Sequence, residues 1–539
     1  GAQVDWDEMF KRMGTFKDVE REEMEHFEEH LATVEAAKKK ESTDVTMDVE
    51  PTNESVAELT NRDAEWRKAL RASMKPKERT AIERVKMPEL DPVYRATTRT
   101  EEVNIGLTKE MALTEAKRCL DCPKPSCMEG CPVNINIPSF VKNIERGQFL
   151  AAAKVLKNTS ALPAVCGRVC PQEKQCESRC VHLKMNKPAV AIGYLERFAA
   201  DYERQSGNIS IPEKDPANGI KVAVVGSGPA GLSFAGDMAK KGFDVTVFEA
   251  LHEIGGVLKY GIPEFRLPNA IVDVEIENLL KMGVKFVADC IVGTTIGVKE
   301  LEKQGFKGIF VASGAGLPNF MNIPGENALN IMSSNEYLTR VNLMDAANPH
   351  TDTPINLGKN VVVVGGGNTA MDSCRTAKRL GANVTLVYRR SEAEMPARLE
   401  EVKHAKEEGI TFLTLHNPKE YEADEKGAVK SVILDVMQLG EPDASGRRRP
   451  EATGETIKLE CDQVIVAVGV SPNPLVPQSI EGLELGRKNT IAVNEQMQSS
   501  QPAIYAGGDI VRGGATVILA MGDGRKAALN MAQQLKPEA

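Results

Sequence analysis

Two kinds of hydrophobic pattern divide the chain. Beyond residue 220, short runs of β-branched residues are followed by glycine turns and amphipathic segments, most clearly over 221–249 and again over 360–390. This alternation is typical of βαβ units in a doubly wound parallel sheet. Within 101–205 the apolar residues instead follow helical spacing, as in 108–120. The pattern therefore predicts an α/β protein in which two doubly wound domains are preceded by an α-helical domain.

The first 85 residues carry a different pattern, dominated by charge. Residues 1–40 are rich in Glu, Lys, Met and Ala, with apolar residues at helical intervals, and predict one or two amphipathic helices. Residues 41–55 are polar and include Pro51, which favours a flexible linker, and residues 60–74 predict a further helix. Because no ligand-like group of side chains occurs here, we interpret 1–85 as a helical acidic extension that is solvated or serves in docking.

Composition and charge narrow the class of protein. The 539 residues suffice for about three to four domains. No run approaches the about 20 apolar residues of a membrane span, so a transmembrane protein is excluded. The net charge of -9 disfavours nucleic acid as a partner. The acidic start of the sequence lacks the form of a secretory signal, and we therefore expect a cytoplasmic protein.

A first glycine-rich turn directly follows a predicted strand and opens a predicted helix. Its glycines are Gly226, Gly228 and Gly231. In this setting they permit a tight turn, a close approach of backbone N–H groups to a pyrophosphate, and close packing of the helix on the strand. Glu249 stands at the end of the next strand, where a carboxylate accepts hydrogen bonds from ribose hydroxyls. The combination predicts a site for an adenine dinucleotide such as FAD or NAD. A turn that serves only packing is the alternative.

A second turn repeats this fingerprint. It comprises Gly365, Gly367, Asn368, Thr369 and Ala370. At the position of the ribose-binding acid stands Tyr388, followed by Arg389 and Arg390. A guanidinium group binds a 2′-phosphate through charge-assisted hydrogen bonds, so this site is expected to prefer NADP(H) to NAD(H). The alternative is that both arginines are ordinary solvated side chains.

Eight of the eleven cysteines fall between residues 119 and 180, in two groups. The groups are Cys119, Cys122, Cys127 and Cys131, and Cys166, Cys170, Cys176 and Cys180. In the absence of an export signal, clustered thiols indicate metal ligands rather than disulfides. Their spacing is denser than that of structural zinc knuckles and is closer to ferredoxin-like [4Fe-4S] sequences, which leaves zinc as the alternative. The remaining three, Cys290, Cys374 and Cys461, are isolated and are expected to be small buried residues.

The carboxyl-terminal segment AIYAGGDIVRGGATVILAM contains Gly508 and Asp509 and then a glycine-led helix. It resembles the closing FAD motif of the two-dinucleotide, glutathione-reductase-like flavoprotein reductases. The resemblance implies that Asp509 bonds the ribityl chain of FAD and that the helix after Gly514 points its amino end at the flavin. Segments 311–316 and 466–472 resemble the crossovers between the FAD and NADPH domains of these enzymes. A split FAD domain, 211–345 and 466–539, is thus expected to enclose an NADPH domain at 346–465.

Five motifs together resemble a single family. They are EAKRCLDCPKPSCMEGCPVNINIPSF, the second cysteine group, GSGPAGL, GGGNTAMDSCRTAKRLGANVTLVYRRSEAEMPAR and GGDIVRGGATV. They resemble the small (beta) subunit of NADPH-dependent glutamate synthase, and they are similar also to the large subunit of NADH-dependent ferredoxin NADP oxidoreductase and to the amino-terminal half of dihydropyrimidine dehydrogenase. The resemblance covers the chain from near Lys86 onward. It implies a helical domain at 86–210 that binds two [4Fe-4S] clusters.

The same resemblance implies how the clusters share their ligands. One cluster would take Cys119, Cys122, Cys127 and Cys180, and the other Cys131, Cys170 and Cys176 with a ligand that is not cysteine. Glu196 stands where the relatives place a Glu or Gln, which makes Cys166 a spare thiol. Cys166 in place of Glu196 stays open as the alternative. A carboxylate ligand would alter the reduction potential of its cluster.

These expectations combine into an electron path. A flavin accepts a hydride from a nicotinamide and passes electrons singly to iron-sulfur centres. Hydride transfer needs positioning rather than a protein acid or base, so no catalytic residue is expected. No site for reducing a metabolite is recognisable, which implies a partner redox subunit.

We therefore expect an NADPH-dependent oxidoreductase that passes electrons through FAD and two [4Fe-4S] clusters to a glutamine-dependent glutamate synthase large chain. One alternative is the large subunit of an electron-bifurcating NADH-dependent ferredoxin NADP oxidoreductase, whose partner would be a flavin and [2Fe-2S] subunit with ferredoxin. The other alternative is a non-catalytic assembly scaffold.

Overall fold

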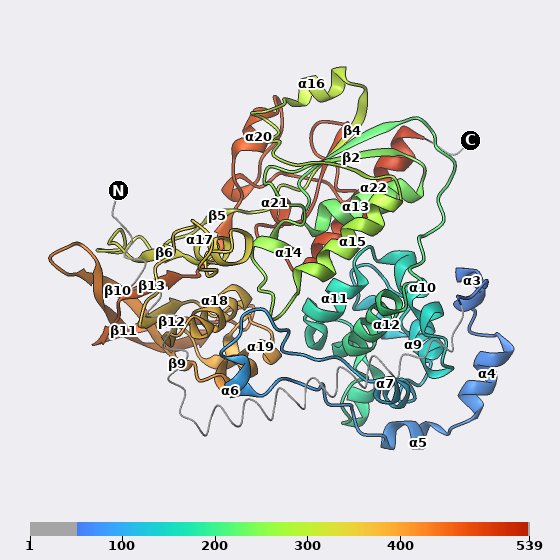
Figure 1. Cartoon of the computed structure of the whole chain (residues 1–539), viewed down its shortest axis with the longest axis horizontal. Coiled ribbons are helices and arrows are strands. Elements are labelled where there is room, and N and C mark those ends of the chain that lie inside the picture. The colour runs from blue at the N-terminus through green and yellow to red at the C-terminus, as the bar shows by residue number, and fades with distance from the viewer. Residues whose placement is uncertain (1–50, 537–539) are drawn as a thin grey trace.

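The structure is a computed structural model that describes residues 51–536. The helices expected within 1–40 and most of the linker expected at 41–55 lie outside the described residues. Figure 1 shows three lobes: a helical lobe, a first sheet lobe that includes β2 and β4, and a second sheet lobe from which β10 and β11 project. The prediction of an α/β protein with two doubly wound sheets and a preceding helical domain is confirmed.

The helical lobe contains the cysteine-rich stretch. Its elements are α7 (Lys109–Ala116), α8 (Ser126–Glu129), α9 (Ile137–Glu145), α10 (Phe149–Thr159), α11 (Pro163–Val169), η2 (Gln172–Lys174), η3 (Glu177–Arg179), η4 (Val181–Met185) and α12 (Ile192–Ser206). The ring of Phe149 packs edge to face, at centroid distances of 5.1 Å from Phe198 and 4.9 Å from Tyr202. These aromatic contacts join α10 to α12 and fix the scaffold on which the cysteine loops rest.

Residues 51–85 pack on the outer side of the helical lobe (Figure 1). They form α3 (Val56–Leu59), α4 (Glu65–Ala72) and α5 (Pro76–Ala81). Leu59 is fully buried and belongs to the same hydrophobic core as Phe140 of α9. This part of the predicted extension is therefore folded onto the helical lobe rather than free in solvent.

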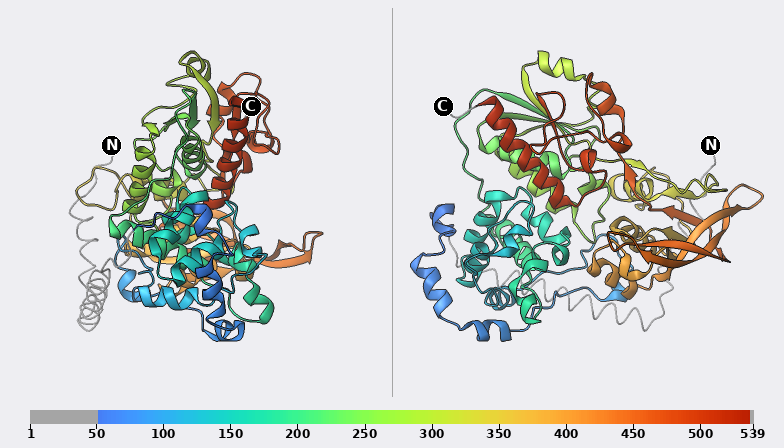
Figure 2. Two further views of the ribbon diagram at one scale, coloured as in Figure 1. Left: turned by 90° about the vertical axis from the view of Figure 1, so that its right-hand side faces the viewer. Right: turned by 180° about the vertical axis from the view of Figure 1, so that it is seen from behind.

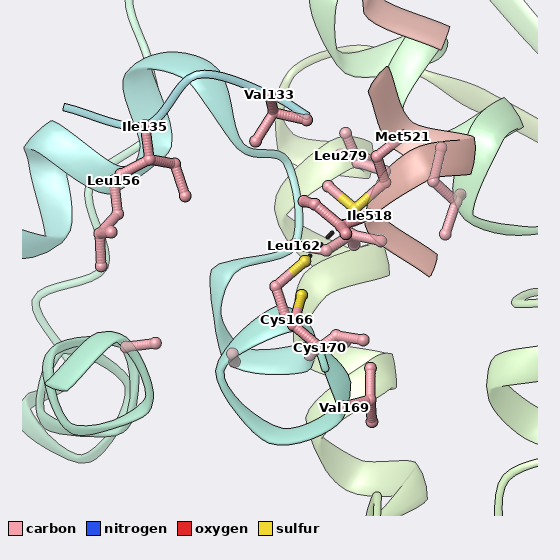
Figure 3. Close-up of a cluster of buried hydrophobic side chains, with 14 of the residues drawn as sticks. Val133, Ile135, Leu156, Leu162, Cys166, Val169, Cys170, Leu279, Ile518 and Met521 are labelled. Carbon is pink, nitrogen blue, oxygen red and sulfur yellow. Dashed lines mark hydrogen bonds between the residues drawn. The ribbon is translucent and has the colours of Figure 1, made fainter. Parts of the chain in front are cut away.

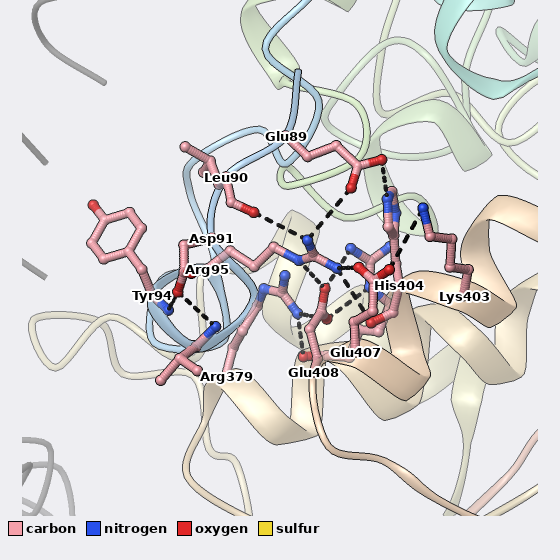
Figure 4. Close-up of polar contacts among 12 residues, drawn as sticks. Glu89, Leu90, Asp91, Tyr94, Arg95, Arg379, Lys403, His404, Glu407 and Glu408 are labelled. Atoms are coloured by element: carbon pink, nitrogen blue, oxygen red, sulfur yellow. Dashed lines mark hydrogen bonds and ion pairs between the residues drawn. The ribbon is translucent and has the colours of Figure 1, made fainter. Parts of the chain in front are cut away.

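The following segment, residues 86–105, runs from the helical lobe to the second sheet lobe. Its helix α6 (Pro92–Arg95) presents Arg95, whose side chain is almost completely buried. Arg95 Nε donates to Glu408 Oε2 over 2.7 Å, and Arg379 Nη1 donates to Glu408 Oε1 over 2.6 Å (Figure 4). Arg375 Nε also donates to Glu408 Oε1, over 2.9 Å, and Arg95 Nη2 donates to a second carboxylate, that of Glu407, over 3.0 Å. This network of ion pairs fixes the segment against the second lobe.

The first sheet lobe contains five parallel strands in the order β15-β4-β1-β2-β3. The strands are β1 (Lys221–Val225), β2 (Asp244–Phe248), β3 (Lys285–Val287), β4 (Phe306–Val311) and β15 (Ile504–Ala506). The helices are α13 (Pro229–Lys240), α14 (Val257–Tyr260), α15 (Asn269–Lys281), α16 (Val298–Lys303), α20 (Leu475–Ser479), η7 (Arg487–Asn489), α21 (Asp509–Arg512) and α22 (Val517–Leu535). Val222, Ala223 and Val224 are all fully buried, because both faces of the sheet are covered, and this explains the continuous apolar run.

The second sheet lobe contains five parallel strands in the order β6-β13-β7-β8-β9. The strands are β6 (Ile331–Ser333), β7 (Asn360–Val364), β8 (Asn383–Tyr388), β9 (Thr411–Thr414) and β13 (Gln463–Val466). The helices are α17 (Ser334–Leu338), η5 (Thr339–Leu343), α18 (Asn368–Arg379), η6 (Glu392–Glu394) and α19 (Leu399–Glu407). Because β6 precedes residue 346, this lobe begins earlier in the chain than the inserted domain expected at 346–465.

Two small sheets complete the architecture. β5 (Leu317–Pro318) pairs antiparallel with β14 (Val470–Ser471), so the two crossings of the chain between the sheet lobes lie side by side. β10 (His416–Ala423), β11 (Val429–Pro442) and β12 (Arg448–Glu460) form an antiparallel sheet that projects from the second lobe (Figure 2). Within residues 51–536, no helix is both long and apolar enough to cross a membrane.

Candidate functional site

The first glycine turn joins β1 to α13 and has the geometry that a bound phosphate requires. Gly226 has a φ of +102°, and a Cβ there would lie 2.2 Å from the carbonyl oxygen of Ala312. A Cβ on Gly231 would lie 2.1 Å from the carbonyl oxygen of Gly226, whereas one on Gly228 would meet no atom within 4 Å. The outer glycines are therefore needed for the turn and its packing, and the middle one leaves open space at the amino end of α13.

Glu249, directly after β2, is held against this turn. Its Oε1 accepts hydrogen bonds from the backbone N of Ser227 over 3.2 Å and from Ser227 Oγ over 2.6 Å. Ser227 Oγ in turn accepts a hydrogen bond from the backbone N of Gly255 over 2.9 Å. Gly256 follows with a φ of +57°, and its Cβ would lie 2.9 Å from Gly228 Cα. This second loop was not predicted, although its adjacent glycines, at 255 and 256, were the available signal.

The carboxyl-terminal loop approaches the same turn. Gly508 has a φ of +78°, and a Cβ there would lie 3.1 Å from Ala230 Cβ at the start of α13. Its backbone N donates to Asp523 Oδ2 over 2.9 Å. Burial raises the pKa of Asp509, although a hydrogen bond from the backbone of Ala515 opposes the shift. The loop thus packs Gly508, the residue before Asp509, against the start of α13.

Tyr260, at the end of α14, is a further residue of this site that sequence reasoning missed. Burial raises the pKa of its hydroxyl to about 12, and the charges of Asp509 and Glu249 add to this shift. Tyr260 therefore lies within electrostatic reach of both predicted FAD-binding acids. Its phenol therefore stays protonated at neutral pH and keeps an O–H group that can donate a hydrogen bond.

The second glycine turn joins β7 to α18 with similar geometry. Gly365 has a φ of +140°, and a Cβ there would lie 2.2 Å from the carbonyl oxygen of Ala467. A Cβ on Gly367 would meet only Pro396 Cγ, at 3.8 Å. Ala370 is fully buried, Thr369 is exposed, and Asn368 Oδ1 accepts a hydrogen bond from the backbone N of Arg398 over 2.9 Å. The open face at Gly367 and the amino end of α18 could hold a pyrophosphate.

Arg389 and Arg390, after β8, lie beyond this turn. Burial and the neighbouring charges of Arg390 and Arg447 lower the pKa of Arg389. The Nε atom of Arg390 is buried without a hydrogen-bond partner. Among residues 51–536, neither Arg389 nor Arg390 forms an ion pair, so their charges are available to an anion. Arg447, in the turn between β11 and β12, was not predicted, because nothing in the sequence distinguishes it from its arginine neighbours.

The cysteines of the helical lobe form two groups in space. Cys127 interacts electrostatically with Cys119, Cys122 and Cys180, which brings the late Cys180 to the first three. Burial raises the pKa of the Cys119 thiol to about 11, so binding of iron there requires release of a proton. The first set of ligands implied by the family resemblance is therefore assembled at one place.

The second group contains three cysteines and one carboxylate. Cys176 interacts with Cys170, Cys131 and Glu196. Glu196 of α12 is only 6% exposed, and its Oε1 has no hydrogen-bond partner. Burial and then the charge of Glu275 raise the pKa of Glu196 to about 8. A buried carboxylate oxygen that lacks a partner and faces three thiols fits a metal-cluster ligand.

Cys166 lies next to this second group, between Cys170 and Met521 of α22. It is fully buried, and its Sγ lies 3.4 Å from Met521 Sδ of α22 (Figure 3). Cys166 also shares a hydrogen bond with Cys170, which lowers the pKa of Cys166, but burial and the charge of Glu196 outweigh it and raise that pKa. Glu196 and Cys166 thus both lie beside the three thiols. The unpartnered Oε1 atom of Glu196 favours Glu196 over Cys166 as the fourth ligand of the second group.

The spacing within both groups argues against a single metal ion. Four thiolates around one zinc ion, at about 2.3 Å each, lie about 3.8 Å from one another. Among residues 51–536, no three cysteines have sulfur atoms within 4.8 Å of one another. This spacing gives no support to the alternative of structural zinc.

The remaining cysteines behave as the sequence predicts. Cys290, Cys374 and Cys461 are buried in the sheet lobes, and none forms a disulfide. Each packs within a hydrophobic core.

Comparison with known proteins places these sites in context. A family model described as pyridine nucleotide-disulphide oxidoreductase matches residues 220–524. A second, described as dihydropyrimidine dehydrogenase domain II, 4Fe-4S cluster, matches residues 95–208. The first covers both sheet lobes, and the second covers the two cysteine groups.

Named relatives match most of the chain. The small chain of glutamate synthase [NADPH] from Azospirillum brasilense is 35% identical over 452 residues, which cover 82% of this chain and 93% of the relative. The beta subunit of NADP(+)-dependent formate dehydrogenase from Moorella thermoacetica is 37% identical over 437 residues, 76% of this chain and 60% of the relative. The structure of Mycobacterium tuberculosis FprA in complex with NADPH aligns with a TM-score of 0.51 at 20% identity, over 59% of this chain and 85% of FprA, which shows a shared fold.

Proposed function

Because this chain belongs to the glutamate synthase [NADPH] small-chain family, we propose that two [4Fe-4S] clusters carry electrons from its FAD to a partner redox subunit. The chain is an NADPH-dependent flavin and iron-sulfur oxidoreductase of the small-chain type. FAD supplies the conversion of a hydride into single electrons. The protein contributes binding, orientation and insulation of the cofactors.

The proposed nucleotide ligands follow from the two turns. FAD would be held by Gly226, Gly228, Gly231, Glu249, Gly508 and Asp509, and NADPH by Gly365, Gly367, Asn368, Thr369, Ala370, Arg389 and Arg390. Within residues 51–536 no carboxylate pairs with Arg389 or Arg390, which supports a preference for the 2′-phosphate of NADPH. We propose no catalytic acid or base, because the residues around the turns position the nucleotides.

The proposed cluster ligands follow from the two cysteine groups. One cluster would be held by Cys119, Cys122, Cys127 and Cys180, and the other by Cys131, Cys170, Cys176 and Glu196. The observation that carries the proposal is the contact of the second group with α22 of the first sheet lobe. A Cβ on Gly522 would lie 2.9 Å from the carbonyl oxygen of Pro132, the residue after Cys131. This contact joins the proposed FAD lobe directly to the loop that carries Cys131.

A basic surface beside the first cysteine group supports docking of the partner there. Ser126 Oγ of α8 donates to the carbonyl oxygen of Arg179 of η3 over 2.7 Å, which joins segment 123–129 to segment 178–188. Leu183 and Met185 are 44% and 43% exposed on this surface. Its exposed cations are Lys124, Arg179, Lys184 and Lys187, against the single acid Glu129. Since the whole chain is acidic, this local excess of positive charge favours an acidic partner.

The proposed partner is a glutamine-dependent glutamate synthase large chain, because the relative from Azospirillum brasilense is a small chain of that enzyme. The eleven cysteines form no disulfide, which suits a reducing compartment, and we propose the cytoplasm. Anaerobic copurification tests the identity of the partner, and an assay of NADPH oxidation by the copurified complex tests the reaction. We expect a large partner and NADPH oxidation that depends on glutamine plus 2-oxoglutarate. A small flavin and [2Fe-2S] partner, with oxidation that depends on ferredoxin plus NAD, would instead show the bifurcating enzyme. A preparation without flavin and iron would show a scaffold.

A further inference from the structure

An unusual buried carboxylate lies within the first cysteine group. Asp121 stands between Cys119 and Cys122, its side chain is fully buried, and its φ is +51°. A positive φ is uncommon for a residue other than glycine and is stable only where the surroundings hold it. The side chains that hold Asp121 in this conformation therefore also determine the conformation of the loop between Cys119 and Cys122.

Three arginines of the segment 51–85 bind this one residue. Arg67 Nη2 and Nε donate to the two carboxylate oxygens of Asp121 over 2.7 and 3.0 Å. Arg71 Nη1 donates to Asp121 Oδ2 over 2.7 Å, and Arg62 Nη2 donates to the carbonyl oxygen of Asp121 over 2.8 Å. Asp121 therefore accepts three hydrogen bonds from two guanidinium groups at its carboxylate and is bonded by a third guanidinium group at its carbonyl oxygen.

The arginines are themselves fixed in place. Arg67 Nη1 donates to Ser139 Oγ of α9 over 2.8 Å. Elsewhere on the segment 51–85, Glu54 pairs with Arg146, at the end of α9, at 3.1 Å. The guanidinium carbon of Arg146 also lies 3.8 Å from the ring centroid of Trp66. The segment is therefore anchored to the helical lobe at several points and does not depend on Asp121 alone.

The charges in this contact do not cancel. Three guanidinium groups face one carboxylate, and the two next to it, on Arg67 and Arg71, have side chains only 3% and 21% exposed. Excess buried positive charge is costly unless an anion balances it. A cluster held by four thiolates is such an anion, and it would lie beside Asp121 because Cys119 and Cys122 flank that residue.

We propose that Arg62, Arg67 and Arg71 are part of the first cluster site, where they position the loop from Cys119 to Cys122 through Asp121 and raise the reduction potential of the cluster. The inference rests on the proposed assignment of Cys119, Cys122, Cys127 and Cys180 to one cluster. The arginines lie before residue 95, at which the iron-sulfur family model begins. Nearby positive charge stabilises the more negative, reduced form of a cluster, and the effect increases with burial.

Redox titration of the anaerobic holoprotein, followed by electron paramagnetic resonance, tests the proposal. In Arg71→Gln we expect iron content to stay near that of the unaltered protein and the midpoint potential of one cluster to decrease, while that of the other cluster does not change. Arg71→Lys, which keeps the charge, should restore most of the potential. Arg146→Gln is the matched control, since it breaks a contact of the same segment away from the cysteines, and it should leave both potentials unchanged.

Arg67→Gln tests the positioning role more severely. Because Arg67 bonds both carboxylate oxygens, its loss should lower the iron content selectively at the first cluster. Unchanged potentials in Arg71→Gln together with full iron content in Arg67→Gln would overturn the inference. Failure of the proposed function is distinct, because the unaltered protein would then lack two cluster signals before any arginine is replaced.

Discussion

Gly522 of α22 packs against the backbone of Pro132, the residue that follows the cluster ligand proposed at Cys131. A Cβ at position 522 would lie 2.9 Å from the Pro132 carbonyl oxygen and 3.2 Å from Pro132 Cβ. Since α22 also packs on α13, which follows the first glycine turn, this one helix contacts both the element that follows the proposed FAD turn and a cysteine loop. A side chain cannot enter without moving one of the two backbones.

Gly522→Val should therefore separate the helical lobe from the first sheet lobe. We expect a loss of about 1–3 kcal/mol in stability from overpacking. Flavin reduction by NADPH should continue at the same rate, while subsequent reduction of the clusters slows, as measured by stopped-flow absorbance. Gly297→Val is the control, because a Cβ on Gly297 would meet no atom within 4 Å and the φ of Gly297 is -87°. Equal cluster reduction in Gly522→Val and the unaltered protein would contradict this role for the contact.

The choice between Glu196 and Cys166 as the eighth ligand can be settled by paired variants. Glu196→Ala should remove or destabilise the second cluster, with a loss of up to roughly half of the iron and acid-labile sulfide. Cys166→Ala should keep both, because its sulfur packs toward Met521. Iron and sulfide analysis of the two purified proteins provides the measurement. Loss of iron in Cys166→Ala alone would assign the ligand to Cys166.

Coenzyme preference tests the two arginines after β8. In Arg389→Ala/Arg390→Ala, each lost hydrogen bond to a charged phosphate should cost about 1.5–3 kcal/mol. The KM for NADPH should then rise by roughly ten- to a hundred-fold per bond. The KM for NADH should change little, since NADH lacks the 2′-phosphate. Arg487→Ala, an exposed arginine of the other sheet lobe, is the control. A parallel rise for both coenzymes would place the arginines outside the 2′-phosphate site.

Glu275 of α15 predicts a specific pH dependence of stability. It is buried at the contact with α11, and burial raises its pKa from 4.5 to about 7, against the opposing charge of Lys157. Between these values the unfolded chain releases a proton that the folded chain keeps, so stability decreases as pH rises through this window and is level above it. The total change is at most about 3 kcal/mol.

Glu275→Gln removes the titrating group, so its melting temperature should depend less on pH between about 5 and 8 and exceed that of the unaltered protein at the upper end. Glu277→Gln, an exposed change on the same helix, should reproduce the unaltered profile. Thermal unfolding of the anaerobic holoprotein at several pH values provides the data. An unchanged profile in Glu275→Gln would show that this carboxyl is already ionised in the folded state.

Much of the nucleotide chemistry could be predicted from the sequence, because it depends on local rules. Gly226 and Gly365 must be glycine for a positive φ and for contact with a neighbouring carbonyl, so their spacing alone indicates the turn. The alternation of strands and helices likewise depends on short-range periodicity. The grouping of Cys180 with the first cysteines is different, since only resemblance to a family implied it.

Other features depend on tertiary contacts that no local pattern encodes. Arg67 and Arg71 lie on a charged helix, whose sequence predicts that both side chains are solvated. Both nevertheless bond Asp121, some fifty residues away in the sequence. β6 is only three residues long and pairs with β13, which is distant in the sequence. No local pattern in the sequence therefore indicates β6, and the predicted start of the second lobe, at residue 346, is too late. Tyr260 carries no motif, and only the approach of Glu249 and Asp509 in space shows its relevance.

The central claim is that electrons pass from NADPH through flavin to iron-sulfur clusters in this chain. Anaerobic titration of the reconstituted protein with NADPH, followed by absorbance and electron paramagnetic resonance, tests it most directly. The account predicts acid-labile sulfide in the protein, bleaching of the flavin, and then the signal of at least one reduced [4Fe-4S] cluster. Zinc without acid-labile sulfide, or a flavin that NADPH bleaches while every cluster stays oxidised, would contradict it.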